Sequence, residues 1–178
     1  MAKKILITLA VLLVALLVVV ATRPDHYTVK RTVAIQAPAA KVFAMLADLH
    51  VWSQWSPWER LDPAMKKTWS GATTGVGAIY EWAGNDQVGK GRIAILEVVP
   101  DKLVRIKLEF VEPWQTISEV QFNLSVQGEQ TAVDWVMQGR AGSLGHKAMG
   151  LLMDMDKMVG DDFERGLADL KALAEKQP

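Results

Sequence analysis

The sequence predicts an α+β domain in which a curved antiparallel sheet of about six or seven strands wraps around one long C-terminal helix. Two observations carry this prediction. Between Tyr27 and Gly139, strand-like runs alternate with tight turns, and only one short helical stretch interrupts them. From about Ser143 to Glu175, a single amphipathic helical pattern closes the chain. A sheet curled around one helix fills its interior incompletely, so we expect an apolar pocket between them.

The domain begins with a strand that is followed by a short helix. Residues 27–36 are predicted as a strand, because β-branched side chains recur and alternate residues from Val29 to Ile35 share one face. Ala37 and Pro38 end that strand. Apolar side chains at helical spacing then predict a short helix, which would pack against the sheet.

A cluster of tryptophans follows the short helix, in residues 51–58. Trp52, Trp55 and Trp58 are three residues apart, a spacing that places side chains on one side of a helical turn. Pro57 disfavours a continuous helix through Trp58. These rings are expected either to line the mouth of the pocket or to pack the segment onto the sheet, with Trp58 as the most exposed of the three.

The remaining strands are predicted by alternation of apolar and polar side chains between turn signals. Turns such as Gly84-Asn85-Asp86 join neighbouring runs directly, and connections this short require antiparallel pairing. The alternation slips near Leu96, which predicts a β-bulge that bends the sheet. The predicted strands are 65–70, 76–82, 88–99, 103–110, 115–127 and 131–139.

Large side chains on the predicted inward faces are candidates for the wall of the pocket. Tryptophan supplies a large apolar area, and methionine adapts to irregular apolar shapes. Buried aromatic residues are more often simple core packing, and that interpretation stays open for each of them. The residues predicted to contact a ligand are Trp52, Trp55, Tyr80, Trp82, Phe110, Trp135, Met137 and Met155.

Residues 1–23 are predicted to be a segment separate from the domain. Lys3 and Lys4 precede a run from Ile5 to Ala21 that is apolar except for Thr8. As a helix this run would be about 26 Å long, near the lower limit for crossing a bilayer. One interpretation is a single-pass membrane anchor with a cytoplasmic amino terminus, which places the domain outside the cytoplasm. The alternative is a signal peptide cleaved after Ala21, which releases a secreted domain.

Composition and motifs exclude several functional classes. Without residues 1–23 the chain carries 17 basic and 20 acidic residues, a balance that argues against a nucleic-acid partner. The chain has no cysteine, and its three histidines show no metal-binding spacing. No Gly-x-Ser-x-Gly motif, phosphate loop or dinucleotide fingerprint occurs. We therefore assign no catalytic residue, metal or cofactor from the sequence.

Short segments along the domain carry a family resemblance. They are Ala37-Pro38 with Val42-Phe43, Trp52-x-x-Trp55-x-Pro57, Gly75-Val76-Gly77, the run from Thr131 to Trp135, and the closing run from Gly160 to Lys171. In this order they resemble the START-like, polyketide-cyclase-type superfamily, often called SRPBCC, across residues 29–176. The resemblance implies a helix-grip fold. Members include lipid carriers, hormone receptors, aromatic-ring cyclases and chaperone co-activators, so the resemblance fixes no single function.

Our interpretation of residues 24–178 is a membrane-tethered domain that binds a hydrophobic small molecule or lipid and has no chemistry of its own. Two alternatives stay open. One is an enzyme resembling polyketide cyclases or dehydratases, for which Tyr80, His50 and Arg92 are the polar candidates. The other is a protein-interaction module of the co-chaperone type, whose interior would be fully packed.

Overall fold

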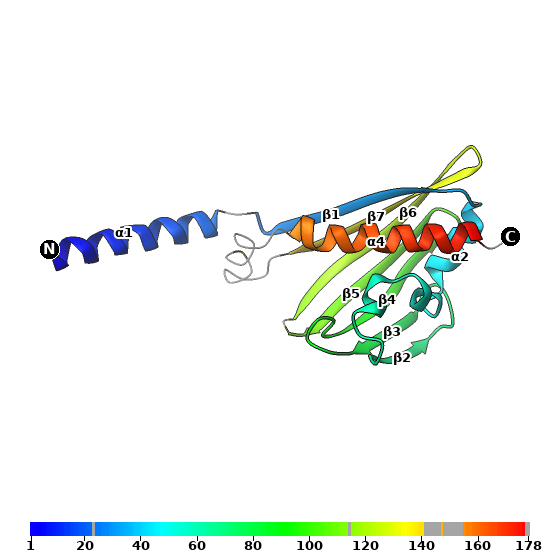
Figure 1. Ribbon diagram of the computed structural model, residues 1–178, viewed down its shortest axis with the longest axis horizontal. Helices are drawn as coiled ribbons and strands as arrows, with labels where there is room; N and C mark the ends of the chain where they lie inside the picture. Colours follow the sequence, from blue (N-terminus) through cyan, green and yellow to red (C-terminus); the bar gives the residue numbers. More distant parts are fainter. Residues whose placement is uncertain (23, 114, 141–146, 148–154, 177–178) are drawn as a thin grey trace.

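The computed structural model describes residues 1–22, 24–113, 115–140, 147 and 155–176. Helix α1 (Ala2–Ala21) extends away from the domain, which is built from a sheet and the helices that lie against it (Figure 1). The predicted apolar N-terminal helix and the predicted α+β layout, a sheet with a long C-terminal helix, are both observed.

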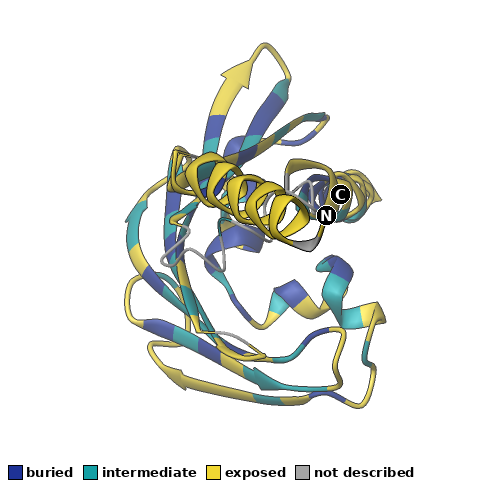
Figure 2. Cartoon of the chain, turned by 90° about the vertical axis from the view of Figure 1, so that its left-hand side faces the viewer, coloured by how far each residue is buried: buried dark blue, intermediate teal, exposed yellow. Residues whose placement is uncertain are grey.

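Seven antiparallel strands form one sheet, in the order β1-β7-β6-β5-β4-β3-β2. The sheet curls around the helices (Figure 2). The register shifts between Ile95 and Glu97, so the bulge predicted near Leu96 is confirmed. The strands are β1 (His26–Ile35), β2 (Lys66–Gly71), β3 (Ala78–Ala83), β4 (Lys90–Val99), β5 (Leu103–Glu112), β6 (Thr116–Gln127) and β7 (Gln130–Arg140).

Among the residues that the structure describes, four helical segments lie against the sheet. Helix α2 (Ala39–Ala47) packs on β5, β6 and β7, and two short turns of 3-10 helix follow it, η1 (Val51–Gln54) and η2 (Pro57–Arg60). Helix α4 (Met155–Lys176) runs along β1 and contacts η2. The predicted start of the last helix, from 143 to 154, lies outside the described residues except for Lys147, which is helical.

Two glycines let α4 approach the sheet closely. A Cβ at Gly160 would lie 2.0 Å from the guanidinium of Arg31, and a Cβ at Gly166 would lie 2.9 Å from the ring of Trp135. Arg31 uses this space to cross beneath the helix, where its Nε donates a hydrogen bond to Glu164 Oε1 at 2.7 Å. The helix is therefore held to β1 by a charged contact at one end and to Trp135 of β7 by ring packing further along.

Three apolar residues that alternation or helical spacing would place on the core side of their elements are exposed. Val76 precedes β3 in a loop, and Val126 lies near the β6–β7 turn, where none of the described helices covers the sheet. Met158 lies in the first turn of α4 and is also exposed, although Phe163 and Leu167 on the same helix are buried. Alternation and helical spacing correctly predict which face of an element is apolar. They do not show how much of that face is covered by the other elements of the fold.

Asp134 gives the first testable prediction. Burial alone would raise the pKa of its carboxyl group, but hydrogen bonds from Lys30 and Thr32, at 2.8 and 2.6 Å, hold the pKa below its ordinary value of 3.8. The carboxylate therefore adds stability above the unfolded pKa, and this stability is lost as the pH falls through the folded pKa. We expect Asp134→Asn to destabilise the domain at neutral pH and to have a smaller effect at about pH 3, which lies below the ordinary pKa, measured by urea unfolding at both pH values. An equal loss of unfolding free energy at the two pH values would contradict the prediction.

Helix α1 carries a segment that is long and apolar enough to cross a membrane. Within this segment, Lys3–Thr22, the most apolar stretch of 18 residues has a mean hydropathy of 3.2 and is almost entirely exposed. A signal sequence meets the same criteria, so length and composition leave both interpretations of the N-terminus open.

Candidate functional site

The concave face of the sheet is divided into a covered part and an open part. In the covered part, under α4, Trp135 stacks on Phe163 with ring centroids 4.0 Å apart and an interplanar angle of 11°. Trp55 and Trp58 meet the same indole edge to face, at 5.6 and 5.9 Å. Phe122 on β6 completes this cluster at 4.9 Å from Trp135. Aromatic rings that pack in this way account for much of the core between the sheet and α4.

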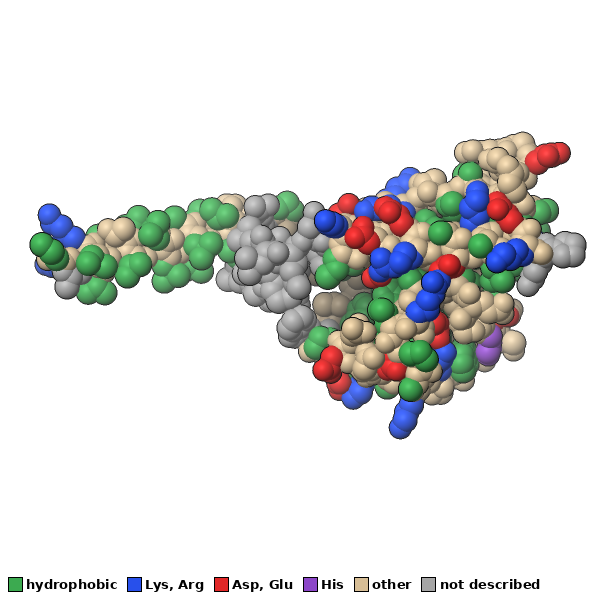
Figure 3. Space-filling view, viewed as in Figure 1, with side chains coloured by type: hydrophobic (Ala, Val, Ile, Leu, Met, Phe, Trp, Pro, Cys, Tyr) green, Lys and Arg blue, Asp and Glu red, His purple; other side chains and the backbone are tan. Residues whose placement is uncertain are grey.

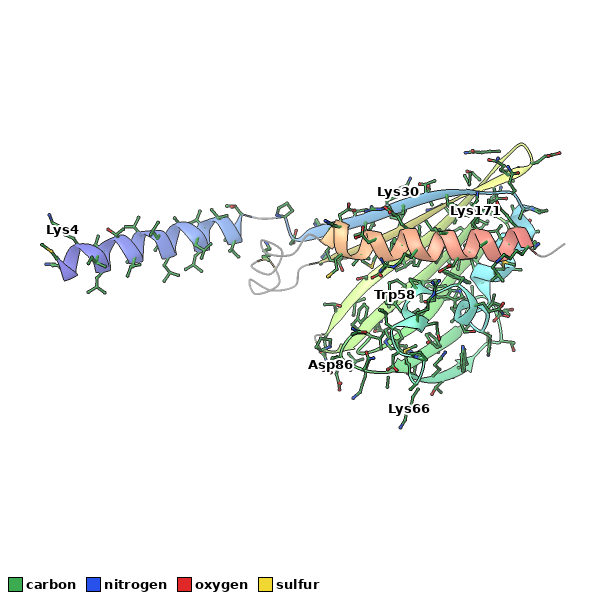
Figure 4. All side chains as sticks on the ribbon, viewed as in Figure 1. Lys4, Lys30, Trp58, Lys66, Asp86 and Lys171 are labelled. Atoms are coloured by element: carbon green, nitrogen blue, oxygen red, sulfur yellow. The ribbon has the colours of Figure 1, made fainter. Side chains whose placement is uncertain are left out.

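The tryptophan segment is held in this cluster by its two short helical turns. Trp52 is buried, and its indole Nε1 donates a hydrogen bond to the carbonyl of Leu46 at 3.1 Å. Pro57 begins η2, as its fixed φ favours. As predicted, Trp58 is the most exposed of the three rings: Trp52 and Trp55 are buried, whereas Trp58 is half-buried beneath α4, where it contacts Phe163 (Figure 4). The segment therefore closes the covered part of the concave face.

The open part is an apolar wall on β3, β4 and β5, made of Trp82, Ile93, Leu108 and Phe110. The strand register places these four side chains on the same face as the buried core, yet each is only half-buried. Trp82 and Phe110 meet edge to face at 5.6 Å. In the space-filling view, hydrophobic side chains are visible in a hollow between α4 and the lower strands (Figure 3). We call these four residues the open wall.

Three polar side chains border the open wall and form what we call the polar triad: Glu59, Lys67 and Tyr80. Lys67 Nζ donates to Glu59 Oε2, and the Tyr80 hydroxyl donates to Glu59 Oε1 at 3.1 Å. The side chains of Glu59 and Lys67 are 13% and 21% exposed. Burial, together with the charge of Glu59 and its hydrogen bond, raises the pKa of Tyr80 well above its ordinary value. The triad thus fixes η2 to the edge of the sheet beside the apolar wall.

The raised pKa of Tyr80 predicts an abnormal tyrosine titration. Its hydroxyl should stay protonated well above pH 10, the ordinary value. Above that pH the unfolded state gains more from deprotonation than the folded state, so stability should fall as the pH rises. Ultraviolet titration of tyrosinate in the native protein, compared with Tyr80→Phe, measures this. If both proteins show the same ionised fraction around pH 10, the buried hydrogen bond to Glu59 is not formed.

The eight residues predicted to contact a ligand lie in different environments. Trp52, Trp55 and Trp135 belong to the covered part, and Met137 is buried between its β1 and β6 neighbours, Val29 and Val120. Their contact with a ligand stays a prediction. Tyr80 belongs to the polar triad, and Trp82 and Phe110 belong to the open wall. Met155 is the first residue of α4, and its side chain lies outside the described residues.

Sequence reasoning missed two members of the polar triad and half of the open wall. Glu59 and Lys67 meet only because η2 folds over the β2 edge. No pattern of neighbouring residues in the sequence predicts that ion pair. Ile93 and Leu108 were missed because aliphatic side chains on an inward face look like ordinary core.

The described residues offer no comparable site elsewhere. A shallow depression of about 300 Å³ lies between α2, η1 and the end of α4, and its lining includes none of the eight predicted residues. Among the residues that the structure describes, no group of three or more acidic or histidine side chains is arranged to hold a metal ion. The open wall with its polar border is therefore the candidate site.

Comparison with known proteins agrees with this architecture. A family model described as polyketide cyclase / dehydrase and lipid transport matches residues 26–175. No curated protein matches the chain. Solved structures share the fold. One is a protein from Mesorhizobium loti that is 17% identical, with a TM-score of 0.62, and the match covers 85% of this chain and 99% of that one.

Two further structures show how widely the fold is used. The Aha1 dimer from Colwellia psychrerythraea is 19% identical, with a TM-score of 0.55, and the match covers 84% of this chain and 96% of that one. Ara h 8.0201 is 9% identical, with a TM-score of 0.57 and coverage of 85% and 99%. At these identities the likeness concerns the fold alone.

The fold is a curved antiparallel sheet closed by a C-terminal helix, and its concave face carries an apolar wall. This arrangement defines a helix-grip protein of the SRPBCC superfamily. Within that class, the chain belongs to the polyketide cyclase / dehydrase and lipid transport family. Membership supports the binding of hydrophobic ligands in general terms.

Proposed function

We propose that the domain binds a hydrophobic small molecule or lipid against the open wall, between β3–β5 and α4. The observation that carries this proposal is the half-burial of Trp82, Ile93, Leu108 and Phe110, which lie on the face that elsewhere forms the core. A ligand that covers about 200 Å² of this apolar surface would gain about 5 kcal/mol before the costs of ordering. Family membership supports the same function.

We further propose that α1 is a membrane anchor. Its twenty residues span about 30 Å as a helix, which matches the hydrocarbon core of a bilayer. Lys3 and Lys4 favour a cytoplasmic amino terminus, so the domain would lie on the other side of the membrane. An anchor would keep the domain close to a source of lipid. A cleaved signal peptide, which releases the domain, is the outcome that N-terminal sequencing of the mature chain would reveal.

The test is the amount of lipid that stays bound to the full-length chain purified from membranes, measured by mass spectrometry of the extract. We expect Trp82→Glu to reduce the bound lipid at least tenfold, because a charge on the open wall opposes the burial of apolar surface. Ile117→Glu is the matched control, since Ile117 lies on the convex face of β6 and is 61% exposed. Equal lipid content in the two variants, or none in the wild type, would exclude this function.

A further inference from the structure

The polar triad has unused hydrogen-bonding capacity. Both oxygens of the Glu59 carboxylate are occupied, one by Lys67 and the other by Tyr80. An ammonium group has three donors, and only one donor of Lys67 has a partner among the residues that the structure describes. The Tyr80 oxygen, which donates its hydrogen to Glu59, keeps lone pairs that can accept. The triad therefore offers two donors and one acceptor.

These groups lie beside the open wall and on the same face. Lys67 is directly opposite Trp82 in the β2–β3 register, and Tyr80 stacks on Trp82 at 6.0 Å with an interplanar angle of 22°. The neighbouring Lys66 points away from the domain, as strand alternation requires (Figure 4). A molecule lying on Trp82 and Phe110 would thus reach the triad with one end.

We propose that the polar triad binds one uncharged oxygen of the ligand, a hydroxyl or a carbonyl, and so selects amphiphilic ligands over plain hydrocarbons. This inference rests on the proposed function, since it places the polar end of the same ligand. The two free donors of Lys67 suit the oxygen lone pairs, and the Tyr80 oxygen accepts from a hydroxyl. No covalent step is involved.

The charge balance of the triad selects against an anionic ligand. The positive charge of Lys67 is already compensated by Glu59, so a carboxylate at this place would add a second negative charge close to the first. Taking that anion out of water would cost more than one shared ammonium group returns. An alcohol, ketone or ester meets the same donors without that penalty.

The experiment compares three probes of one shape: naphthalene, β-naphthol and β-naphthoate. Each is equilibrated by dialysis with the full-length chain in lipid nanodiscs, and empty nanodiscs measure the share that dissolves in lipid. We expect the wild type to bind β-naphthol about tenfold more tightly than naphthalene and β-naphthoate, which is what one hydrogen bond to a charged donor provides.

Two variants assign the preference to the triad. Tyr80→Phe removes the acceptor, and the double variant Lys67→Met with Glu59→Gln removes both charges without leaving either one buried alone. In both, the preference for β-naphthol should fall below threefold while naphthalene binds as before. The matched control is Lys90→Met with Glu112→Gln, which removes an exposed ion pair of 2.8 Å that belongs neither to the triad nor to the open wall and should keep the tenfold preference.

The outcomes separate this inference from the proposed function. If the wild type binds naphthalene and β-naphthol equally, or if the double variant keeps the tenfold preference, the subsite is excluded while ligand binding stands. Tighter binding of β-naphthoate would likewise exclude a subsite for an uncharged oxygen. If no probe binds to the wild type beyond the empty nanodiscs, the proposed function fails and the subsite fails with it.

Discussion

Replacing Trp135 with alanine is expected to lower the free energy of unfolding by about 3–5 kcal/mol. Trp135 is 2% exposed. Its indole stacks on Phe163 and contacts Phe122, Trp55 and Trp58. All four rings lose a shared packing partner when the indole is removed. The substitution also leaves a cavity, and the packed core closes only partly around it. Urea unfolding of the full-length chain in lipid nanodiscs, followed by near-ultraviolet circular dichroism, measures the loss.

The control is Trp69→Ala, which removes the same side chain from a different environment. Trp69 lies on the edge strand β2, is 37% exposed, and contacts His50 and Tyr80. We expect a loss of about 1 kcal/mol there, since less apolar area is withdrawn from water. Similar losses at Trp69 and Trp135 would mean that the ring cluster under α4 is not the main source of stability.

The fold could be predicted from the sequence because its signals are local. The alternation from Leu103 to Phe110 identifies both the strand and its inward face, and short turns such as Gly84-Asn85-Asp86 dictate antiparallel neighbours. The slip near Leu96 even located the bulge. Each of these features depends on residues a few positions apart.

The site could be predicted only in part, because it depends on which elements lie above the sheet. Trp135 and Trp82 follow the same alternation, yet one lies under α4 and the other is left half-buried. The difference arises because α4 lies along β1, at the far edge of the sheet from β3. Glu59 was missed for the same reason, since its partner Lys67 reaches it only after η2 has folded over β2.

Gly91 shows how a residue without a side chain shapes the open wall. It lies on the concave face directly opposite Trp82, and a Cβ there would lie 2.4 Å from the Trp82 ring and 2.6 Å from the carbonyl oxygen of Glu109. Glycine weakens a strand interior, so its presence in β4 has a packing reason. The indole occupies the space that any side chain would fill, and it is held there by a hydrogen bond from Nε1 to the Val88 carbonyl at 3.0 Å.

We expect Gly91→Val to cost about 3 kcal/mol of stability, because overpacking outweighs the gain of about 1 kcal/mol that valine brings to a strand. If the clash is mainly with the indole, the cost should fall to about 1 kcal/mol in a Trp82→Ala background, where only the contact with the Glu109 carbonyl remains. A double-mutant cycle measured by urea unfolding gives the coupling directly. Additive losses would contradict this prediction, because the Glu109 carbonyl rather than the indole would then set the cost of the valine. Strong coupling would place the indole over Gly91, and this position of the indole sets the surface that a ligand meets.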